Sequence, residues 1–236
     1  MRRYFPARLM VAVAALAASQ PGAARPLGRR VEDRGTFVIS IAGKNVGRER
    51  FEIRSDQDMV EASGEVEIRA QQQGRPAEFQ THPDLVLDSH LWPETYTWKQ
   101  TAPRSSALKI NFLASPATAR YRILNGKSDL REFVLPKNVV VLDDNVLSHY
   151  EILVLRYLRT SKGRQSFPAF IPQEALPGRV NVVEGANQEI GVAGSKLNAR
   201  HFIITTDLSR IEVWTNRAGH LERVSIPSIH LTALRK

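Results

Sequence analysis

The chain has 236 residues and a formal net charge of +9 at pH 7. It contains no cysteine, which excludes disulfide bonds, thiol catalysis, cysteine-ligated zinc and lipid attachment through an N-terminal cysteine. Its arginines are scattered singly rather than gathered into a block. The charge therefore indicates a mild attraction to anionic surfaces and disfavours nucleic acid as a partner.

Residues 1–24 are predicted to be a cleaved signal peptide. Three arginines within the first eight residues precede an apolar run at 9–18, and small residues at 22–24 supply a cleavage point. The run is shorter than the roughly twenty apolar residues that a spanning helix needs, which favours cleavage over a retained membrane anchor. Cleavage removes three arginines and no acidic residue, so the net charge falls from +9 to +6. We expect an exported protein, periplasmic or extracellular, with peripheral membrane contact at most.

Residues 25–35 are rich in arginine, proline and glycine, a composition typical of a solvated tether. Residues 36–236 are numerous enough for one large β-rich domain or two small ones, and we predict a single domain.

Alternation of apolar and polar residues predicts strands along most of this domain. The pattern is clearest at 60–70, where Val60, Ala62, Val66 and Ile68 share one face. The other strands are expected at 37–41, 48–54, 77–87, 95–100, 106–113, 118–124, 130–135, 179–184, 189–192, 198–206, 210–215, 221–226 and 229–234. The last three of these are predicted to be adjacent antiparallel partners, and the prolines within 167–172 confine that extended segment to an edge or a covering loop.

The first long hairpin also has a predicted register. A four-residue loop at 55–58 would place Arg48 opposite Glu65 and Glu52 opposite Glu61, the second being a like-charge pair. We interpret the charged face as a solvated outer surface with weak ion pairs, and an anionic-partner site is the alternative.

One segment changes to helical periodicity. Apolar residues recur at helical spacing from Val146 to Leu158, and Gly163 follows as a stop, which predicts an amphipathic helix near 144–161 that covers the sheet. Asp143, Asp144 and Asn145 are interpreted as N-terminal caps. The alternative is that these acidic residues, with Ser148 and His149, do chemistry or bind a cation.

No catalytic residue is assigned. Ser148 and His149 are adjacent on a helix and so point in different directions, and the chain lacks a nucleophile-elbow motif. The six histidines lack metal-site spacing, although a weak site around His82 and His90 with Asp84 and Asp88 stays open. We expect no enzyme activity, no metal and no cofactor.

These patterns predict a mainly β (α+β) fold, namely a curved antiparallel sheet or half-open β-barrel of ten or more strands with one covering amphipathic helix. Segments 43–51, 142–150 and 211–221 resemble an uncharacterised family of exported bacterial proteins that has no assigned activity. More distantly, the chain is similar to the open β-barrels of bacterial lipoprotein carriers. That resemblance implies a curved sheet with helical cover that holds acyl chains.

The favoured functional hypothesis is that the sheet binds a lipid, acyl chain or other hydrophobic ligand in a cavity. The candidate lining, which would serve equally well as a packed core, is Phe37, Ile39, Phe51, Trp98, Phe112, Phe202 and Trp214. The alternative is an envelope protein that binds another protein through an edge strand or its basic surface. A hydrolase is a poorer third option because no nucleophile or acid-base pair is signalled.

Overall fold

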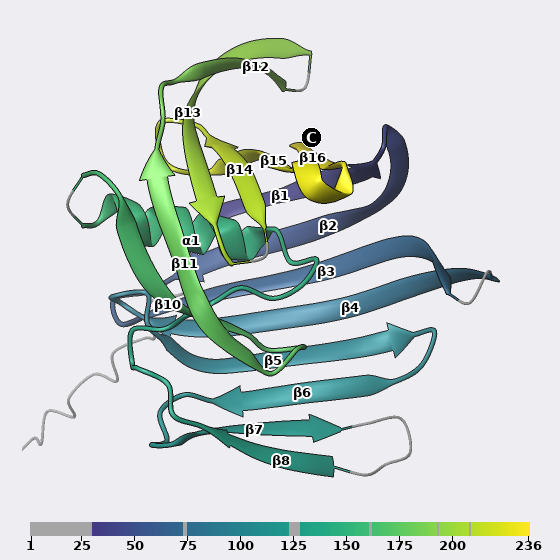
Figure 1. Cartoon of the computed structure of the whole chain (residues 1–236), viewed down its shortest axis with the longest axis vertical. Coiled ribbons are helices and arrows are strands. Elements are labelled where there is room, and N and C mark those ends of the chain that lie inside the picture. The colour runs from purple at the N-terminus through teal and green to yellow at the C-terminus, as the bar shows by residue number, and fades with distance from the viewer. Residues whose placement is uncertain (1–29, 73–74, 123–127, 161, 193, 208) are drawn as a thin grey trace, which may run out of the picture.

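A computed structural model describes residues 30–236, apart from 73–74, 123–127, 161, 193 and 208. The predicted signal peptide and residues 25–29 lie outside the described residues. Among the described residues, the strands form one sheet in which β8 and β9 are the two ends (Figure 1), so the sheet is not closed. The predicted fold class, a curved sheet or half-open barrel with one helix, is confirmed.

The sheet begins as a meander in which each strand pairs with the next. In chain order its strands are β1 (Arg30–Ile41), β2 (Lys44–Ser55), β3 (Met59–Gln72), β4 (Arg75–Asp88), β5 (Pro93–Ala102), β6 (Ser106–Asn111), β7 (Ala117–Arg122) and β8 (Ser128–Phe133). The chain then crosses back through β9 (Val140–Val141) into helix α1 (Ser148–Leu158).

The C-terminal half completes the sheet from the other side. It contains β10 (Gln165–Ile171), β11 (Leu176–Glu184), β12 (Gln188–Val192), β13 (Ser195–Thr205), β14 (Arg210–Thr215), β15 (Leu221–Ile226), the short 3-10 helix η1 (Pro227–Ile229) and β16 (Leu231–Arg235). Strand β16 pairs with β1 and so joins the two halves, and β14, β15 and β16 are adjacent antiparallel neighbours as predicted. Strand β10 pairs with β9 over only two residue pairs, consistent with the prolines nearby.

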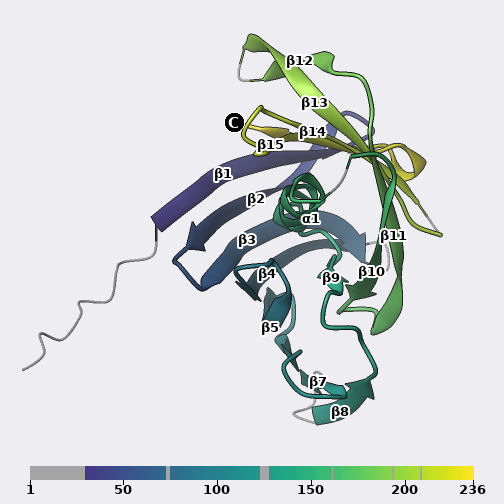
Figure 2. The same ribbon diagram turned by 90° about the vertical axis from the view of Figure 1, so that its left-hand side faces the viewer.

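Each predicted strand overlaps an observed strand, because period-two alternation is a local property that the folded sheet preserves. Helix α1 is shorter than predicted and lies within the curl of the sheet (Figure 2). Eight of its eleven residues are buried, among them Leu153 and Val154. The helix therefore fills the concavity of the sheet rather than covering it with a single face.

The predicted tether extends too far along the chain. Residues 30–35 lie in β1, where Asp33 is buried and accepts two hydrogen bonds from Arg235 of β16, at 2.5 and 2.7 Å. This contact spans 202 positions, so a local composition rich in arginine and glycine gave no sign of it. In the described part of the chain, no helix is long and apolar enough to cross a membrane.

The predicted register of the β2–β3 hairpin is wrong by two residues. Arg48 lies opposite Glu67, Arg50 opposite Glu65, and Arg54 opposite Glu61. The shift separates the like-charge pair of the predicted register, because Glu61 lies opposite Arg54 and Glu52 lies opposite Ser63. Because it is an even number of residues, every side chain stays on its predicted face.

Candidate functional site

A pocket of about 450 Å³ lies where the N-terminal end of α1 meets β10, β11, β14 and η1. Its apolar walls include Leu142, Tyr150, Ile171, Ile211, Ile226 and Ile229. Its volume is within the range of pockets that hold small organic ligands, roughly 300–1,000 Å³.

Two small residues that face each other explain why the pocket is open. Ala169 of β10 pairs directly with Gly178 of β11, and both line the pocket. Gly178 occupies the same face of β11 as Val180 and Val182, which are fully buried. A Cβ atom added at Gly178 would meet nothing within 4 Å. The core face therefore lacks the side chains that would fill this end of the sheet.

Carboxylates gather at one part of this pocket. Asp143 is buried and accepts hydrogen bonds from the Tyr96 hydroxyl, from the backbone N–H of Gln173 at 3.2 Å and from that of Asp144 at 3.0 Å. Burial raises the pKa of Asp143. Asp144 and Glu174 are exposed at the mouth, and partial burial together with the charges of Glu174 and Asp143 raises the pKa of Asp144 to about 6.

The predicted N-terminal caps of the helix are wrong. The residue that precedes the first turn is Leu147, and none of the side chains predicted to cap the helix does so. Instead, the carboxylate of Glu49 on β2 accepts the backbone N–H groups of Leu147 at 2.6 Å and Ser148 at 3.1 Å. Glu49 is fully buried, and this burial raises its pKa to about 7. A side chain 98 positions away has taken the role that local residues were expected to fill.

A second buried carboxylate, Glu151, connects α1 to the C-terminal strands. It accepts the backbone N–H of Leu221 at 2.8 Å and lies 3.2 Å from His220 Nδ1. Burial raises the pKa of Glu151 to about 7, and its hydrogen bond raises the pKa of His220. Burial alone would raise the pKa of Asp33, but the hydrogen bonds and charge of Arg235 outweigh it and lower that pKa.

Asp33, Glu151 and His220 could each offer one atom to a metal ion, because these atoms lie within 4.8 Å of one another. Arg235 already supplies a cation there through its paired contact with Asp33. We therefore interpret the group as a structural charge network. Sequence spacing gave no sign of it, since Glu151 is 69 positions from His220. At the open alternative around His90, the imidazole Nδ1 lies 3.7 Å from Asp88 in an exposed position.

The Ser148–His149 pair is not arranged as a catalytic pair. The Nδ1 atom of His149 accepts the backbone N–H of Asp143 at 3.2 Å, and burial lowers the pKa of His149 to about 3, so the ring is neutral. Its Nε2 atom is buried without a hydrogen-bond partner among the described residues.

The seven residues predicted to line a cavity do not line this pocket. Phe37 and Phe51 stack at 5.4 Å between ring centroids, and Ile39, Trp98 and Phe202 are buried in the same core. Phe112 is partly buried and packs against that core. Trp214 is buried on the other side of the sheet, in a small cluster with Ile190 and Ala199. Five of the seven therefore belong to the main packed core, which was the alternative use for them.

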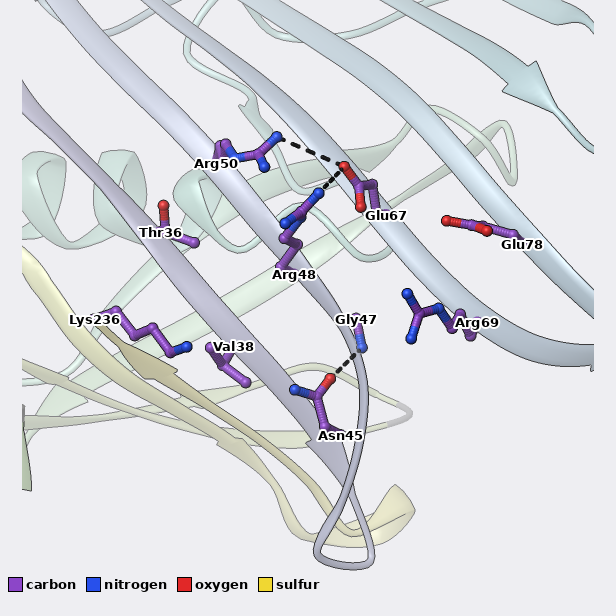
Figure 3. Close-up of a pocket in the computed structure, with 10 residues that line it drawn as sticks. All are labelled: Thr36, Val38, Asn45, Gly47, Arg48, Arg50, Glu67, Arg69, Glu78 and Lys236. Atoms are coloured by element: carbon purple, nitrogen blue, oxygen red, sulfur yellow. Dashed lines mark hydrogen bonds and ion pairs between the residues drawn. The ribbon is translucent and has the colours of Figure 1, made fainter.

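A smaller hollow of about 290 Å³ lies over the charged faces of β1, β2 and β3 (Figure 3). Arg48 pairs with Glu67 at 2.7 Å, and Arg50 pairs with Glu65 at 2.7 Å and with Glu67 at 3.6 Å. Such exposed pairs contribute about 0.2–1 kcal/mol and already engage the two arginines. The arrangement favours the solvated-surface interpretation over an anionic-partner site.

Comparisons with known proteins assign no family to the chain. No family model matches it, and no curated protein matches it. Among solved structures, it is similar to a DUF1089 family protein from Pseudomonas aeruginosa, with 11% sequence identity and a TM-score of 0.49 over 77% of this chain and 90% of that one. The resemblance to an uncharacterised exported family stays a prediction.

Proposed function

We propose that the chain binds the apolar part of a lipid or other hydrophobic molecule in the pocket between β10, β11 and η1. The observation that carries the proposal is the open floor at Ala169 and Gly178, where two facing strands present no side chain larger than a methyl group. An apolar ligand there would fill space that the core leaves empty.

The mouth of the pocket supports the same proposal. Leu176 and Ile229 line it and are 42% and 51% exposed, so apolar surface borders the opening. An apolar ligand would remove part of this surface from water, which contributes about 25 cal/mol per Å² buried. We further propose that the protein works outside the cytoplasm, on the basis of the predicted signal peptide at 1–24.

The first experiment is native mass spectrometry of protein purified from its own cell envelope, followed by organic extraction. We expect a bound apolar molecule at one per chain. A protein that carries no such molecule and takes up none when lipids are added would overturn the proposal.

A matched pair of variants locates the site. Gly178→Phe adds a ring to the pocket floor, and Gly191→Phe adds the same ring to β12, also at a glycine with open space around it. With the neutral probe N-phenylnaphthylamine, we expect at least about tenfold weaker binding for Gly178→Phe and no change for Gly191→Phe. Equal binding by both variants would place the ligand elsewhere. Near-ultraviolet circular dichroism checks that both variants are folded.

A second candidate function is protein binding through the edge strand β8. This strand ends the sheet, and Leu130 on it is 58% exposed. Unpaired strand edges are templates for strand addition. A photo-crosslinking residue at position 130 should then capture one defined envelope protein, whereas the same residue at Leu113, exposed on a bend outside the sheet, should not. Equal capture from both positions would argue against this candidate.

A further inference from the structure

The pocket has a charge opposite to that of the chain. Among the described residues, four with carboxylates line it, namely Asp143, Asp144, Glu174 and Asp207, against one guanidinium, that of Arg179. The chain as a whole carries a formal net charge of +9. A local excess of negative charge in a basic protein attracts cations to this opening and repels anions from it.

The single cation of the lining does not neutralise these carboxylates. Arg179 donates from Nη1 to the hydroxyl of Ser166 on β10 at 3.3 Å. It alternates along β11 with buried Val180, so its side chain belongs to the opposite face of the strand. Among the ion pairs of the described residues, none involves Asp144, Glu174 or Asp207.

The carboxylates at the pocket mouth repel one another. The neighbouring charges of Glu174 and Asp143 add to partial burial in raising the pKa of Asp144 to about 6. Among the described residues, the hydrogen-bond donors to Asp143 are neutral and include the Tyr96 hydroxyl and the backbone N–H groups of Gln173 and Asp144. A positive charge placed beside Asp144 would relieve this repulsion.

A neutral polar group completes this end of the pocket. Tyr150, in the first turn of α1, is partly buried and lines the pocket, and none of the hydrogen bonds found among the described residues involves its hydroxyl. Burial raises the pKa of Tyr150 to about 12, so the group stays a neutral hydroxyl that can accept a hydrogen bond. Tyr150 and the carboxylates together offer acceptors to a ligand that carries several donors.

We propose that the ligand is an amphiphile with a protonated amine, whose ammonium group lies at Asp144, Glu174 and Tyr150 and whose chain lies over Ala169 and Gly178. This inference rests on the proposed function and narrows its ligand class. An ammonium group has three donors and no acceptor, which matches an end of the pocket that presents acceptors. A carboxylate-headed ligand of the same length would add a further negative charge there.

The test compares three ligands that share one chain and differ in the head group: dodecylamine, dodecanol and dodecanoic acid. Binding to the purified mature protein is measured by displacement of N-phenylnaphthylamine at pH 7 and low salt, below the aggregation concentration of each ligand. We expect the amine to bind at least about tenfold tighter than the alcohol, and the acid to bind most weakly. High salt should reduce the advantage of the amine.

Variants assign this preference to the carboxylates. The double variant Asp144→Asn with Glu174→Gln should bind amine and alcohol about equally while it keeps the affinity for alcohol. Glu189→Gln, which removes an exposed carboxylate on β12, should leave the preference unchanged. A lysophosphatidylethanolamine arm identifies the source of the amine: binding as tight as that of dodecylamine assigns it to a lipid headgroup, and weaker binding assigns it to a free alkylamine.

The outcomes separate this inference from the function on which it rests. If the alcohol binds as tightly as the amine to the unaltered protein, the amine inference is wrong and the apolar-ligand function stands. If the acid binds best, the pocket prefers a negative head group and the amine inference is wrong. If none of the three binds, both proposals fail.

Discussion

The buried carboxylates that bind helix α1 to its neighbours and those around the pocket are chemically alike but have opposite environments. Glu49 and Glu151 are fully buried, and both accept backbone N–H groups from other elements. Asp144 and Glu174 are exposed at the pocket mouth beside one another and beside Asp143. The difference teaches that a carboxylate inside this fold is held by hydrogen-bond donors, whereas the carboxylates at the pocket mouth lie together without a cation among the described residues, which is the basis of the proposed amine site.

The buried carboxylates depend on their partners. The contact between Arg235 and Asp33, which lies beside Glu151, gives the largest expected effect on stability. Arg235→Met would leave buried Asp33 without its guanidinium partner, with only His220 nearby at 3.5 Å among the described basic groups, and would remove hydrogen bonds to the carbonyl oxygens of Leu221 and Arg34. We expect a loss of about 3 kcal/mol in the free energy of unfolding, measured by urea denaturation. Arg48→Met, which breaks an exposed pair, should change it by less than about 1 kcal/mol. Similar losses in both variants would show that the buried pair has no special role.

The capping role of Glu49 gives the next largest effect. Glu49→Ala leaves the N–H groups of Leu147 and Ser148 without an acceptor in a buried site. The free energy of unfolding should fall by about 2 kcal/mol, and the helical circular dichroism signal should become less stable toward urea. Glu52→Ala, on the exposed face of the same strand, is the control and should cost about 0.5 kcal/mol or less.

The same residue predicts a pH dependence. Because the pKa of Glu49 rises from 4.5 to about 7 on folding, the folded state binds more protons than the unfolded state between these values. Stability should therefore fall as the pH rises from about 4.5 to about 7. Urea denaturation across this range should show a decline in the free energy of unfolding that is larger by about 2–3 kcal/mol in the unaltered protein than in Glu49→Gln, which cannot ionise. Parallel curves would mean that Glu49 is not the responsible group.

Removing a carboxylate from the pocket mouth should raise stability, whereas removing Glu49 lowers it. This is the smallest of the expected effects. Asp144→Asn removes one of the repelling charges, so it should raise the free energy of unfolding at pH 7 by about 0.5 kcal/mol, a modest gain because solvent screens an exposed carboxylate. The gain should disappear as the pH falls through about 6 toward 3.8, where the native carboxyl becomes protonated. A loss of stability at pH 7 would contradict the comparison, because it would show that Asp144 is a structural residue.

Much of the fold could be predicted from local patterns. Individual residues show which features local patterns could not predict. The alternation around Val60, Ala62 and Val66 identified β3, and the helical spacing before Gly163 identified α1. One signal for Glu49 was present as well, because it alternates with Arg48 and Arg50 and shares the face of Phe51 and Ile53. A carboxylate on an apolar face requires a partner, although the sequence did not indicate which one.

The pocket could not be predicted from sequence patterns. Ala169 and Gly178 are ordinary small residues until β10 and β11 pair in the register that sets them opposite each other. The aromatic residues expected in a cavity are instead the filled core, because large side chains with the right periodicity pack against one another and against α1.

The sequence by itself determined the inward faces and the order of fourteen of the sixteen described strands and the approximate position of helix α1, since these depend on periodicities that extend over a few residues; β9 and β10 were not predicted as strands. Only the tertiary structure decided the β2–β3 register, the cap that Glu49 supplies, the Asp33–Arg235 contact and the pocket with its carboxylates. Each of these depends on contacts between residues distant in the chain, whose partners are chosen by packing and charge when the sheet curls around α1.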